Sequence, residues 1–291
     1  MNLRQSAEIQ SEPDYLDVTA PDGVRLSVRT GGRRGAPAIV FIHGFNQSHG
    51  AWAKQFEGPL ADEFHLVAFD LRGHGDSDKP EDEAAYRESK RWADDVAAIL
   101  RALDLTRVVL VGWSYGGRVI LDYLAAYGPH ALAGINFVAG VVGDEKEYYG
   151  EDVGLIKGTY SSNPAEAAEA TRKFLRACFA DEPPAADFEQ MLAYNMAVTP
   201  DVRKKLGGRK VGAHDLLAGL TLPVLFTHGT HDRIIAPAMS EYGAATVPNA
   251  RLSIFEGTGH SPFYEKHGLF DSELRDFVHA CHTIPEPAEE E

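Results

Sequence analysis

The stretch Gly112–Gly117, "GWSYGG", follows the apolar run "RVVLV" at residues 107–111 and leads into the amphipathic segment "SYGGRVILDYLAAYG". Gly112, Ser114 and Gly116 fit the pattern G-x-S-x-G, which alone is weak because glycine and serine are common residues. Between a strand and a helix, the pattern predicts a serine on a sharp, strained turn with its hydroxyl exposed. The glycines are then a steric requirement, because strand and helix pass too close for side chains. A glycine-rich packing turn is the alternative interpretation.

Continuous apolar runs alternate with helical patterns along most of the chain. The runs lie at residues 36–44, 65–75, 107–114, 132–140, 223–232 and 251–260. Runs that are apolar on both faces are typical of parallel strands buried beneath helices. Ahead of them, residues 15–30 hold two short strand patterns around Pro21-Asp22-Gly23, which indicates a hairpin. We therefore expect an α/β fold with a mostly parallel central sheet flanked by helices.

One long region interrupts this alternation. Residues 143–212 contain helical patterns and no good strand, and Asn163-Pro164 is a favourable helix start. A region of this length greatly exceeds an ordinary crossover between strands. We expect 143–212 to be a helical cap inserted into a core of residues 1–142 and 213–283. Helices that simply join the flanking layers are the alternative. The acidic tail at 284–291 has little to bury and is predicted to be disordered.

The composition and charge argue against several function classes. The formal net charge is −15 at pH 7 and no basic stripe is present, so neither nucleic acid nor an anionic membrane is expected as a partner. No apolar segment of about 18 residues appears, and the first residues lack the apolar region of a signal peptide. Cys178 and Cys281 stand far apart, which argues against a zinc site or a disulfide framework. We expect a cytoplasmic protein without a metal.

A serine hydroxyl needs a base to take its proton and a carboxylate to orient that base. His260 stands on a glycine-flanked loop after one apolar run, and Asp232 directly follows another. The order Ser114, Asp232, His260 is therefore a candidate catalytic triad. Asp144, one strand earlier, is the alternative acid. Five other histidines are interpreted as structural: His43, His74, His228, His231 and His267.

The charge that develops on the substrate oxygen needs hydrogen-bond donors as well. The backbone N–H of Tyr115 is one candidate, because it begins a predicted helix, where N–H groups lack partners. The N–H of Phe45 is the other, because His43-Gly44 turns the chain at the end of an earlier strand run. These two amides form the predicted oxyanion hole.

With these pieces in order, the chain resembles the α/β-hydrolase superfamily from about Tyr15 to Cys281. The matching segments are "HGF" at 43–45, "DLRGHGDSD" from Asp70, "GWSYGG", "HGTHDRIIAP" and "GTGHSPF". The resemblance implies that the serine, aspartate and histidine named above are nucleophile, acid and base. It gives Asp70 and Arg72 a structural role beside the pocket. Haloalkane dehalogenases and epoxide hydrolases of this superfamily carry aspartate in place of the serine, so their chemistries are not expected.

The resemblance further implies a serine hydrolase that cleaves carboxylic esters or lactones through an acyl-enzyme, without a cofactor. We expect Phe45, Trp113 and Tyr115 to line an aromatic, uncharged pocket, and such a pocket predicts a small, neutral, apolar ester or lactone as substrate. Aromatic residues of the cap are further candidates for the pocket, with core packing as their alternative role: Phe174, Phe179 and Tyr194. The alternative functions are a cofactor-free perhydrolase or acyltransferase with the same triad, and a hydrolase-fold receptor with slow turnover. The oligomeric state is not predicted.

Overall fold

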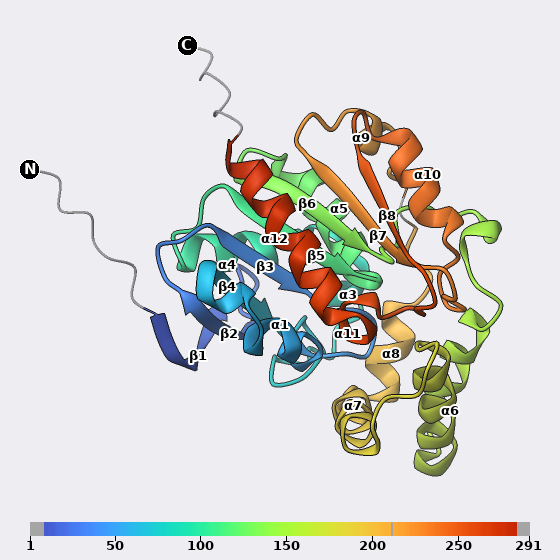
Figure 1. Ribbon diagram of the computed structural model, residues 1–291. Helices are drawn as coiled ribbons and strands as arrows, with labels where there is room; N and C mark the ends of the chain where they lie inside the picture. Colours follow the sequence, from blue (N-terminus) through green and yellow to red (C-terminus); the bar gives the residue numbers. More distant parts are fainter. Residues whose placement is uncertain (1–8, 211, 284–291) are drawn as a thin grey trace, which may run out of the picture.

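The computed structural model describes residues 9–210 and 212–283, with side chains from residue 14 onward. Its centre is an eight-stranded sheet with the strand order β1-β2-β4-β3-β5-β6-β7-β8 (Figure 1). The strands are β1 Ile9–Thr19, β2 Arg25–Arg33, β3 Ala38–Ile42, β4 His65–Phe69, β5 Val108–Trp113, β6 Leu132–Val138, β7 Val224–Gly229 and β8 Arg251–Phe255.

Helices connect the strands and cover both faces of the sheet (Figure 1). Before β6 these are the 3₁₀ helix η1 His49–Trp52, α1 Ala53–Glu57, α2 Leu60–Glu63, α3 Ala84–Arg87, α4 Ser89–Ala102 and α5 Tyr115–Tyr127. Between β6 and β7 lie η2 Lys146–Tyr148, η3 Val153–Tyr160, α6 Pro164–Ala177, α7 Ala185–Ala197, α8 Pro200–Leu206 and α9 His214–Ala218. Then follow α10 Ala238–Thr246, α11 Pro262–Glu265 and α12 His267–Thr283.

The sheet is mostly parallel, as the sequence predicted. Strands β4, β3, β5, β6, β7 and β8 pair in parallel, and every residue of β3 through β7 is buried. Strands β1 and β2 form the predicted antiparallel hairpin, and β2 continues antiparallel onto β4. Gly23 in the hairpin turn has φ +88°, a conformation that glycine adopts without strain.

Alternate residues of each central strand point to opposite faces of the sheet and belong to two separate hydrophobic layers. Val40 and Ile42 of β3 join the layer that contains Trp92 of α4. Ile39 and Phe41, which point to the opposite face, join the layer that contains Phe270 and other residues of α12. Burial of each large apolar side chain stabilises the fold by about 1.5–3 kcal/mol. The sheet is therefore held from both sides, which explains why its strands read as unbroken apolar runs.

The segment 143–212 is helical, and α6, α7 and α8 lie together below the sheet in Figure 1. Asn163 caps α6 as the sequence indicated: its side chain accepts a hydrogen bond from the N–H of Ala165 at 3.0 Å. An isolated antiparallel bridge joins Tyr149 to Ile235, just after β7. The division of the chain into a core and a cap stays a prediction, and the acidic tail at 284–291 lies outside the described residues.

Both cysteines are buried free thiols. Across residues 9–210 and 212–283, none of the helices combines the length and the apolar character that a bilayer crossing needs.

One buried carboxyl group opposes folding at neutral pH. Asp271 of α12 is 4% exposed, and its Oδ1 accepts a hydrogen bond of 3.0 Å from Nε2 of Gln55. Its Oδ2 is buried without a partner among the described residues. Burial raises the pKa of Asp271 to about 6, although the Gln55 hydrogen bond opposes the shift. A folded-state pKa above the unfolded value means that this group stabilises the fold when protonated, and that this contribution is lost as the pH rises through 6.

We therefore expect Asp271→Asn to stabilise the protein at pH 7.5, because the amide keeps an acceptor for Gln55 and carries no charge. A pKa raised from 3.8 to about 6 corresponds to up to about 3 kcal/mol. Urea unfolding of both proteins at pH 7.5 and 4.5 measures the effect, and the gain should shrink at the lower pH. A variant less stable than the parent at pH 7.5 would contradict this account.

Candidate active site

Ser114 occupies a sharp turn between β5 and α5. Its backbone has φ 54° and ψ −115°, a strained combination for a residue with a side chain. Hydrogen bonds hold the turn: the Ser114 N–H donates to the carbonyl of Val138 at 3.0 Å, and the Ser114 carbonyl accepts from Gly117 at 3.0 Å and Val141 at 2.9 Å. These bonds tie the strained residue to β6 and to the loop that follows it.

The glycines around Ser114 are required by close contacts. A Cβ on Gly112 would lie 2.8 Å from the carbonyl oxygen of Gly116, and one on Gly116 would lie 2.4 Å from the carbonyl oxygen of Ile42. A Cβ on Gly117 would lie 2.9 Å from Cα of Gly140. Helix α5 can therefore approach β5, the end of β3 and the loop after β6 this closely only if these positions carry no side chain.

His260 and Asp232 meet beside this turn. Asp232 lies on the loop after β7, His260 on the loop after β8, and Nδ1 of His260 is 2.7 Å from Oδ2 of Asp232. An ionised carboxylate only accepts hydrogen bonds, so Nδ1 carries the proton. In the neutral ring Nε2 is then unprotonated, which is the form that a general base needs.

The carboxylate of Asp232 is held by four groups. Its Oδ1 accepts hydrogen bonds from the N–H groups of Ile234 at 2.8 Å and Ile235 at 2.9 Å. Its Oδ2 lies 2.7 Å from Nδ1 of His260 and 3.0 Å from Nε2 of His228. Burial alone raises the pKa of Asp232, but the two imidazoles outweigh it and hold that pKa below its usual range. Asp232 is therefore ionised across the neutral pH range.

His228 is a part of this site that the sequence did not reveal. Its Nε2 lies 2.9 Å from the carbonyl of Ile235 and 3.0 Å from Asp232, both acceptors, so Nε2 carries the proton. Its Nδ1 then accepts from the hydroxyl of Ser240 at 2.7 Å. The signal available in the sequence was that His228 stands four residues before Asp232, near the end of β7. From the sequence alone we interpreted His228 as a structural residue.

The alternative acid lies elsewhere. Asp144 is exposed, and its Oδ2 accepts a hydrogen bond of 3.0 Å from the N–H of Gly212. Among the described residues no hydrogen bond or ion pair joins it to His260, whose Nδ1 is taken by Asp232. The geometry favours Asp232 over Asp144 as the acid.

The loop that carries His260 is fixed to the serine turn and to α6. The indole N–H of Trp113 donates to the carbonyl of His260 at 2.8 Å, and the N–H of His260 donates to the carbonyl of Cys178 at 2.9 Å. Glu265 accepts from the N–H groups of Gly259 and Ala180, each at 2.8 Å. The imidazole therefore cannot move independently of the residue before Ser114.

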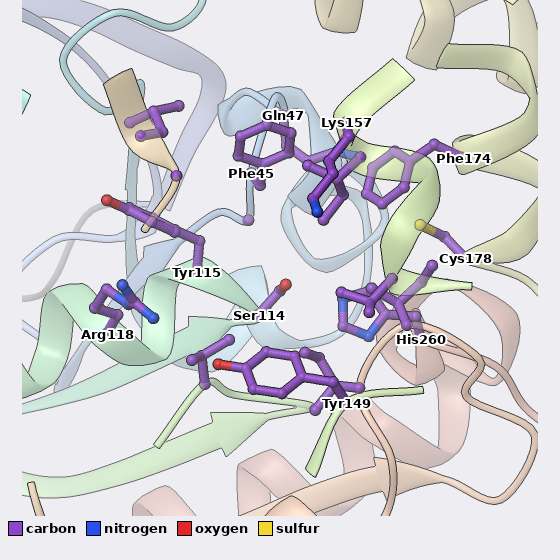
Figure 2. A pocket seen from close by; sticks show the side chains of 18 of the residues that line it. Phe45, Gln47, Ser114, Tyr115, Arg118, Tyr149, Lys157, Phe174, Cys178 and His260 are labelled. Carbon is purple, nitrogen blue, oxygen red and sulfur yellow. The ribbon is translucent and has the colours of Figure 1, made fainter. Parts of the chain in front are cut away.

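A cavity of about 410 Å³ joins the predicted groups. Ser114, His260, Phe45, Trp113 and Tyr115 all line it. Figure 2 shows the Ser114 hydroxyl directed into the space, with His260 across from it. No hydrogen bond links these two side chains among the described residues, which is common before substrate binds because catalytic contacts tighten in the complex.

The two amides predicted to bind the oxyanion lie at this cavity. Within residues 9–210 and 212–283, the backbone N–H groups of Phe45 and Tyr115 donate to no other protein group. The N–H of Tyr115 is at the first position of α5, where the helix leaves it unpaired. Gly44 allows the loop after β3, which carries Phe45, to approach the serine turn closely, since a Cβ at Gly44 would lie 3.1 Å from Cβ of Ser114. Both donors are therefore free to receive a ligand oxygen.

Phe179 and Tyr194, expected among the substrate contacts, do not line this cavity. They line a separate small cavity of about 10 Å³ behind Trp113. The reason is packing: the ring of Phe179 meets that of Tyr264 edge-on at 5.5 Å. Phe174 of α6 does line the main cavity, 6.2 Å from the ring of Phe45.

The expectation of an uncharged pocket is also wrong. Arg118, Arg209 and Lys157 line the main cavity together with its aromatic residues. The sequence concealed this because Arg118 falls within an apolar helix pattern and Arg209 stands far away in the chain.

Asp70 and Arg72 are buried and lie outside this cavity. Asp70 accepts from the N–H of His49 at 2.7 Å and lies 2.9 Å from its Nδ1. Arg72 is bound to Asp95 and Asp22, with ion-pair distances of 2.6 and 2.9 Å. Both residues cross-link loops beside the site. In the described part of the chain, no group of three or more histidine, cysteine, aspartate or glutamate side chains could hold a metal ion.

Comparison with known proteins agrees with this architecture. The model of the family described as alpha/beta hydrolase fold matches residues 37–267. A provisionally assigned aryl esterase from Burkholderia cenocepacia is 34% identical, with 93% of this chain and 100% of that chain covered and a TM-score of 0.90. The esterase RhEst1 from Rhodococcus sp. ECU1013 is 35% identical, with 92% and 99% covered and a TM-score of 0.86. The bifunctional esterase/perhydrolase DCH of Acinetobacter calcoaceticus is 28% identical over 261 residues, or 84% of this chain and 92% of the relative.

Ser114→Ala is expected to abolish turnover of an activated ester such as p-nitrophenyl acetate, with a loss on the order of 10⁵-fold in kcat. The backbone hydrogen bonds of the turn remain, so the melting temperature should change little. Stopped or continuous release of p-nitrophenol measures the rate. A variant that keeps a tenth of the parent rate would exclude Ser114 as nucleophile.

Asp232→Asn is expected to lower kcat by roughly 10⁴-fold, because an amide at this position favours the wrong tautomer of His260. Asp144→Asn is the matched control, since it makes the same chemical change at an exposed carboxylate and should leave the rate within about twofold. The two variants are compared by kcat on the same ester. The reverse order of effects would move the acid to Asp144.

Proposed function

The chain belongs to the α/β-hydrolase family, and on that basis we propose that it is a serine hydrolase that cleaves carboxylic esters through an acyl-enzyme intermediate. The observation that supports this best is the pair Asp232–His260, whose 2.7 Å contact fixes the imidazole tautomer at the cavity that Ser114 lines. The esterase relatives, two of which are at least 34% identical over most of the chain, support the same activity.

In the proposed reaction, the hydroxyl oxygen of Ser114 attacks the ester carbonyl and its proton passes to Nε2 of His260. The carbonyl oxygen becomes an oxyanion, which the N–H groups of Phe45 and Tyr115 receive. The bond to the alcohol then breaks, the alcohol leaves with the proton from His260, and an acyl-serine remains. Water, deprotonated by His260, attacks the acyl-serine, and Ser114 and the carboxylic acid are released. Lactones are cyclic esters, and the same steps open them.

Asp232 acts on this sequence through His260. When His260 takes the serine proton it becomes positively charged, and the buried carboxylate stabilises that charge at 2.7 Å. His228 keeps the same carboxylate oxygen in place from the other side at 3.0 Å. Because the Asp232 carboxylate is already held by its hydrogen-bond partners, it needs little reorganisation when the imidazolium forms. Preorganised groups lower the activation barrier of a reaction in this way.

Apolar acyl groups suit one side of the cavity. Phe45 and Phe174 meet there edge-to-face, with ring centres 6.2 Å apart and an angle of 90°. An acyl chain that leaves the oxyanion near Phe45 would run along these rings. We propose small esters and lactones with apolar acyl groups as substrates, and p-nitrophenyl esters of two to eight carbons together with lactones as the first assay.

Peracid formation is a second candidate function, and the bifunctional esterase/perhydrolase relative supports it. Hydrogen peroxide in place of water would attack the acyl-serine, which yields a peracid and restores the Ser114 hydroxyl. Incubation with acetate, peroxide and bromide tests this, because a peracid oxidises the halide. Bromide oxidation that persists in Ser114→Ala would show that the triad is not its source.

Phe174→Ala is expected to shift the preferred acyl chain to greater length, because the space that the ring leaves admits further methylenes. Each methylene that fits or misfits an apolar pocket changes the transition-state binding free energy, which kcat/KM reports, by about 1–3 kcal/mol. The measurement is kcat/KM across p-nitrophenyl esters of increasing chain length. Tyr194→Ala is the control, since it removes an aromatic ring from the neighbouring small cavity. A uniform loss across all chain lengths in Phe174→Ala would mean that this ring only stabilises the fold.

A further inference from the structure

The main cavity has a cationic side that the proposed ester hydrolysis does not use. Arg118 stands one helical turn after Ser114 on α5, about 6 Å further along the helix axis. Its side chain lines the cavity, and the residue is 8% exposed. Figure 2 shows its guanidinium group beside the Tyr149 hydroxyl, on the same side of the cavity as Tyr115. An arginine stays protonated in proteins, so this is a permanent, largely buried positive charge.

In the described part of the protein no carboxylate lies within ion-pair distance of this charge, although Asp122 and the Tyr149 side chain interact with it electrostatically. Arg118 donates one hydrogen bond, from Nη1 to the carbonyl of Arg209, and it makes no ion pair with a described carboxylate. Its Nε is buried without a hydrogen-bond partner among the described residues. A guanidinium taken from water normally finds a carboxylate or a full set of acceptors, since an unpaired buried charge is costly.

The neighbouring arginine is, by contrast, fully engaged. Nη2 of Arg209 lies 2.6 Å from a carboxylate oxygen of Asp122 and 3.0 Å from the Ser89 hydroxyl, and its Nη1 lies 3.0 Å from the Tyr115 hydroxyl. Asp122 is therefore paired with Arg209, and the two guanidinium groups together exceed this carboxylate by one positive charge at the cavity. Lys157, on the opposite wall, adds an exposed ammonium group that Figure 2 shows directed into the same space.

We propose that the cavity binds an ester that itself carries a carboxylate, and that Arg118 receives this carboxylate while Ser114 attacks the ester carbonyl. The substrate class is the monoester of a short dicarboxylic acid. The helical spacing of the two residues sets the separation of the two carbonyl groups at a few atoms. Guanidinium groups bind carboxylates through charge-assisted hydrogen bonds, which are about twice as strong as neutral ones. The inference rests on the proposed ester hydrolysis. It revises the expectation of a wholly neutral substrate with an apolar acyl group, because the acyl group of such a monoester ends at Arg118 and not at the rings of Phe45 and Phe174.

A purely structural role for Arg118 makes a different prediction. The hydrogen bond to Arg209 and the contact with the Tyr115 ring, 5.6 Å from the guanidinium carbon, would also be lost in a variant. Disruption of these contacts would affect all esters alike. Loss of a carboxylate-binding group would affect only substrates that carry a carboxylate.

The test compares monoethyl glutarate with ethyl 5-methylhexanoate, in which an isopropyl group replaces the carboxylate without a change in chain length. Acid release in a pH-stat gives kcat/KM for each ester. We expect the parent enzyme to prefer the monoester. The ratio of kcat/KM for monoethyl glutarate to kcat/KM for ethyl 5-methylhexanoate measures this preference. Arg118→Met should lower the ratio by about 10- to 100-fold, which is the effect expected from the loss of one charged hydrogen bond. Arg118→Lys should restore part of the ratio, because the charge remains.

Arg101→Met is the matched control, since it removes the same charge from an exposed position on α4 and should leave the ratio unchanged. A ratio in Arg118→Met equal to that of the parent, or a parent enzyme that prefers the neutral ester, would overturn the assignment. Failure of the parent enzyme on both esters and on p-nitrophenyl acetate would instead overturn the proposed ester hydrolysis. If Arg118→Met does not fold, the ratio in Arg118→Lys and the parent preference still decide the question.

Discussion

The positive φ of Ser114 is the constraint on which the rest of the site depends. A residue with a side chain adopts φ 54° at a cost of about 1–3 kcal/mol, so the surrounding structure must hold it there. It does so with backbone hydrogen bonds from Ser114 to Val138, Gly117 and Val141. The same turn lifts the hydroxyl into the cavity and leaves the Tyr115 N–H unpaired beside it. One local strain therefore positions both the proposed nucleophile and a backbone donor for the charge that its attack would create.

The other members of the site are fixed to this turn through contacts between distant segments. Trp113, the residue before the serine, donates its indole N–H to the carbonyl of His260, and the N–H of His260 donates to Cys178 at the end of α6. The loop of Asp232 is bound in turn by residues of 143–212, since the N–H of Gly150 donates to the carbonyl of Ile234 at 2.9 Å. The helical segment therefore supports the histidine and the aspartate as well as covering the cavity. A change in this segment therefore reaches His260 and Asp232 through backbone hydrogen bonds.

The sequence predicted those features whose signals are local. The parallel sheet follows from apolar runs, and the serine turn follows from glycines that stand within three residues of Ser114 in the sequence. Which side chains face the cavity depends on how distant segments pack together in the folded protein, and a local sequence pattern does not contain this information. Phe179 was expected there and packs on Tyr264, whereas Arg118, for which the sequence predicted no role, lines the wall. His228 was missed because its contact with Asp232 appears only when the chain after β7 folds back on the strand end.

The charges of the surface and of the cavity have opposite signs, and they act over different distances. The net charge of −15 repels anions, but salt screens this field beyond about 8 Å at physiological ionic strength. The guanidinium of Arg118 is largely buried at the wall of the cavity, where an interaction at contact distance is several times stronger than in water. The surface therefore affects how fast an anionic ester arrives, and the cavity decides whether it stays. In the proposed reaction, the apolar rings of Phe45 and Phe174 and the guanidinium of Arg118, one helical turn beyond Ser114, contact different parts of the ester and so orient its carbonyl toward Ser114.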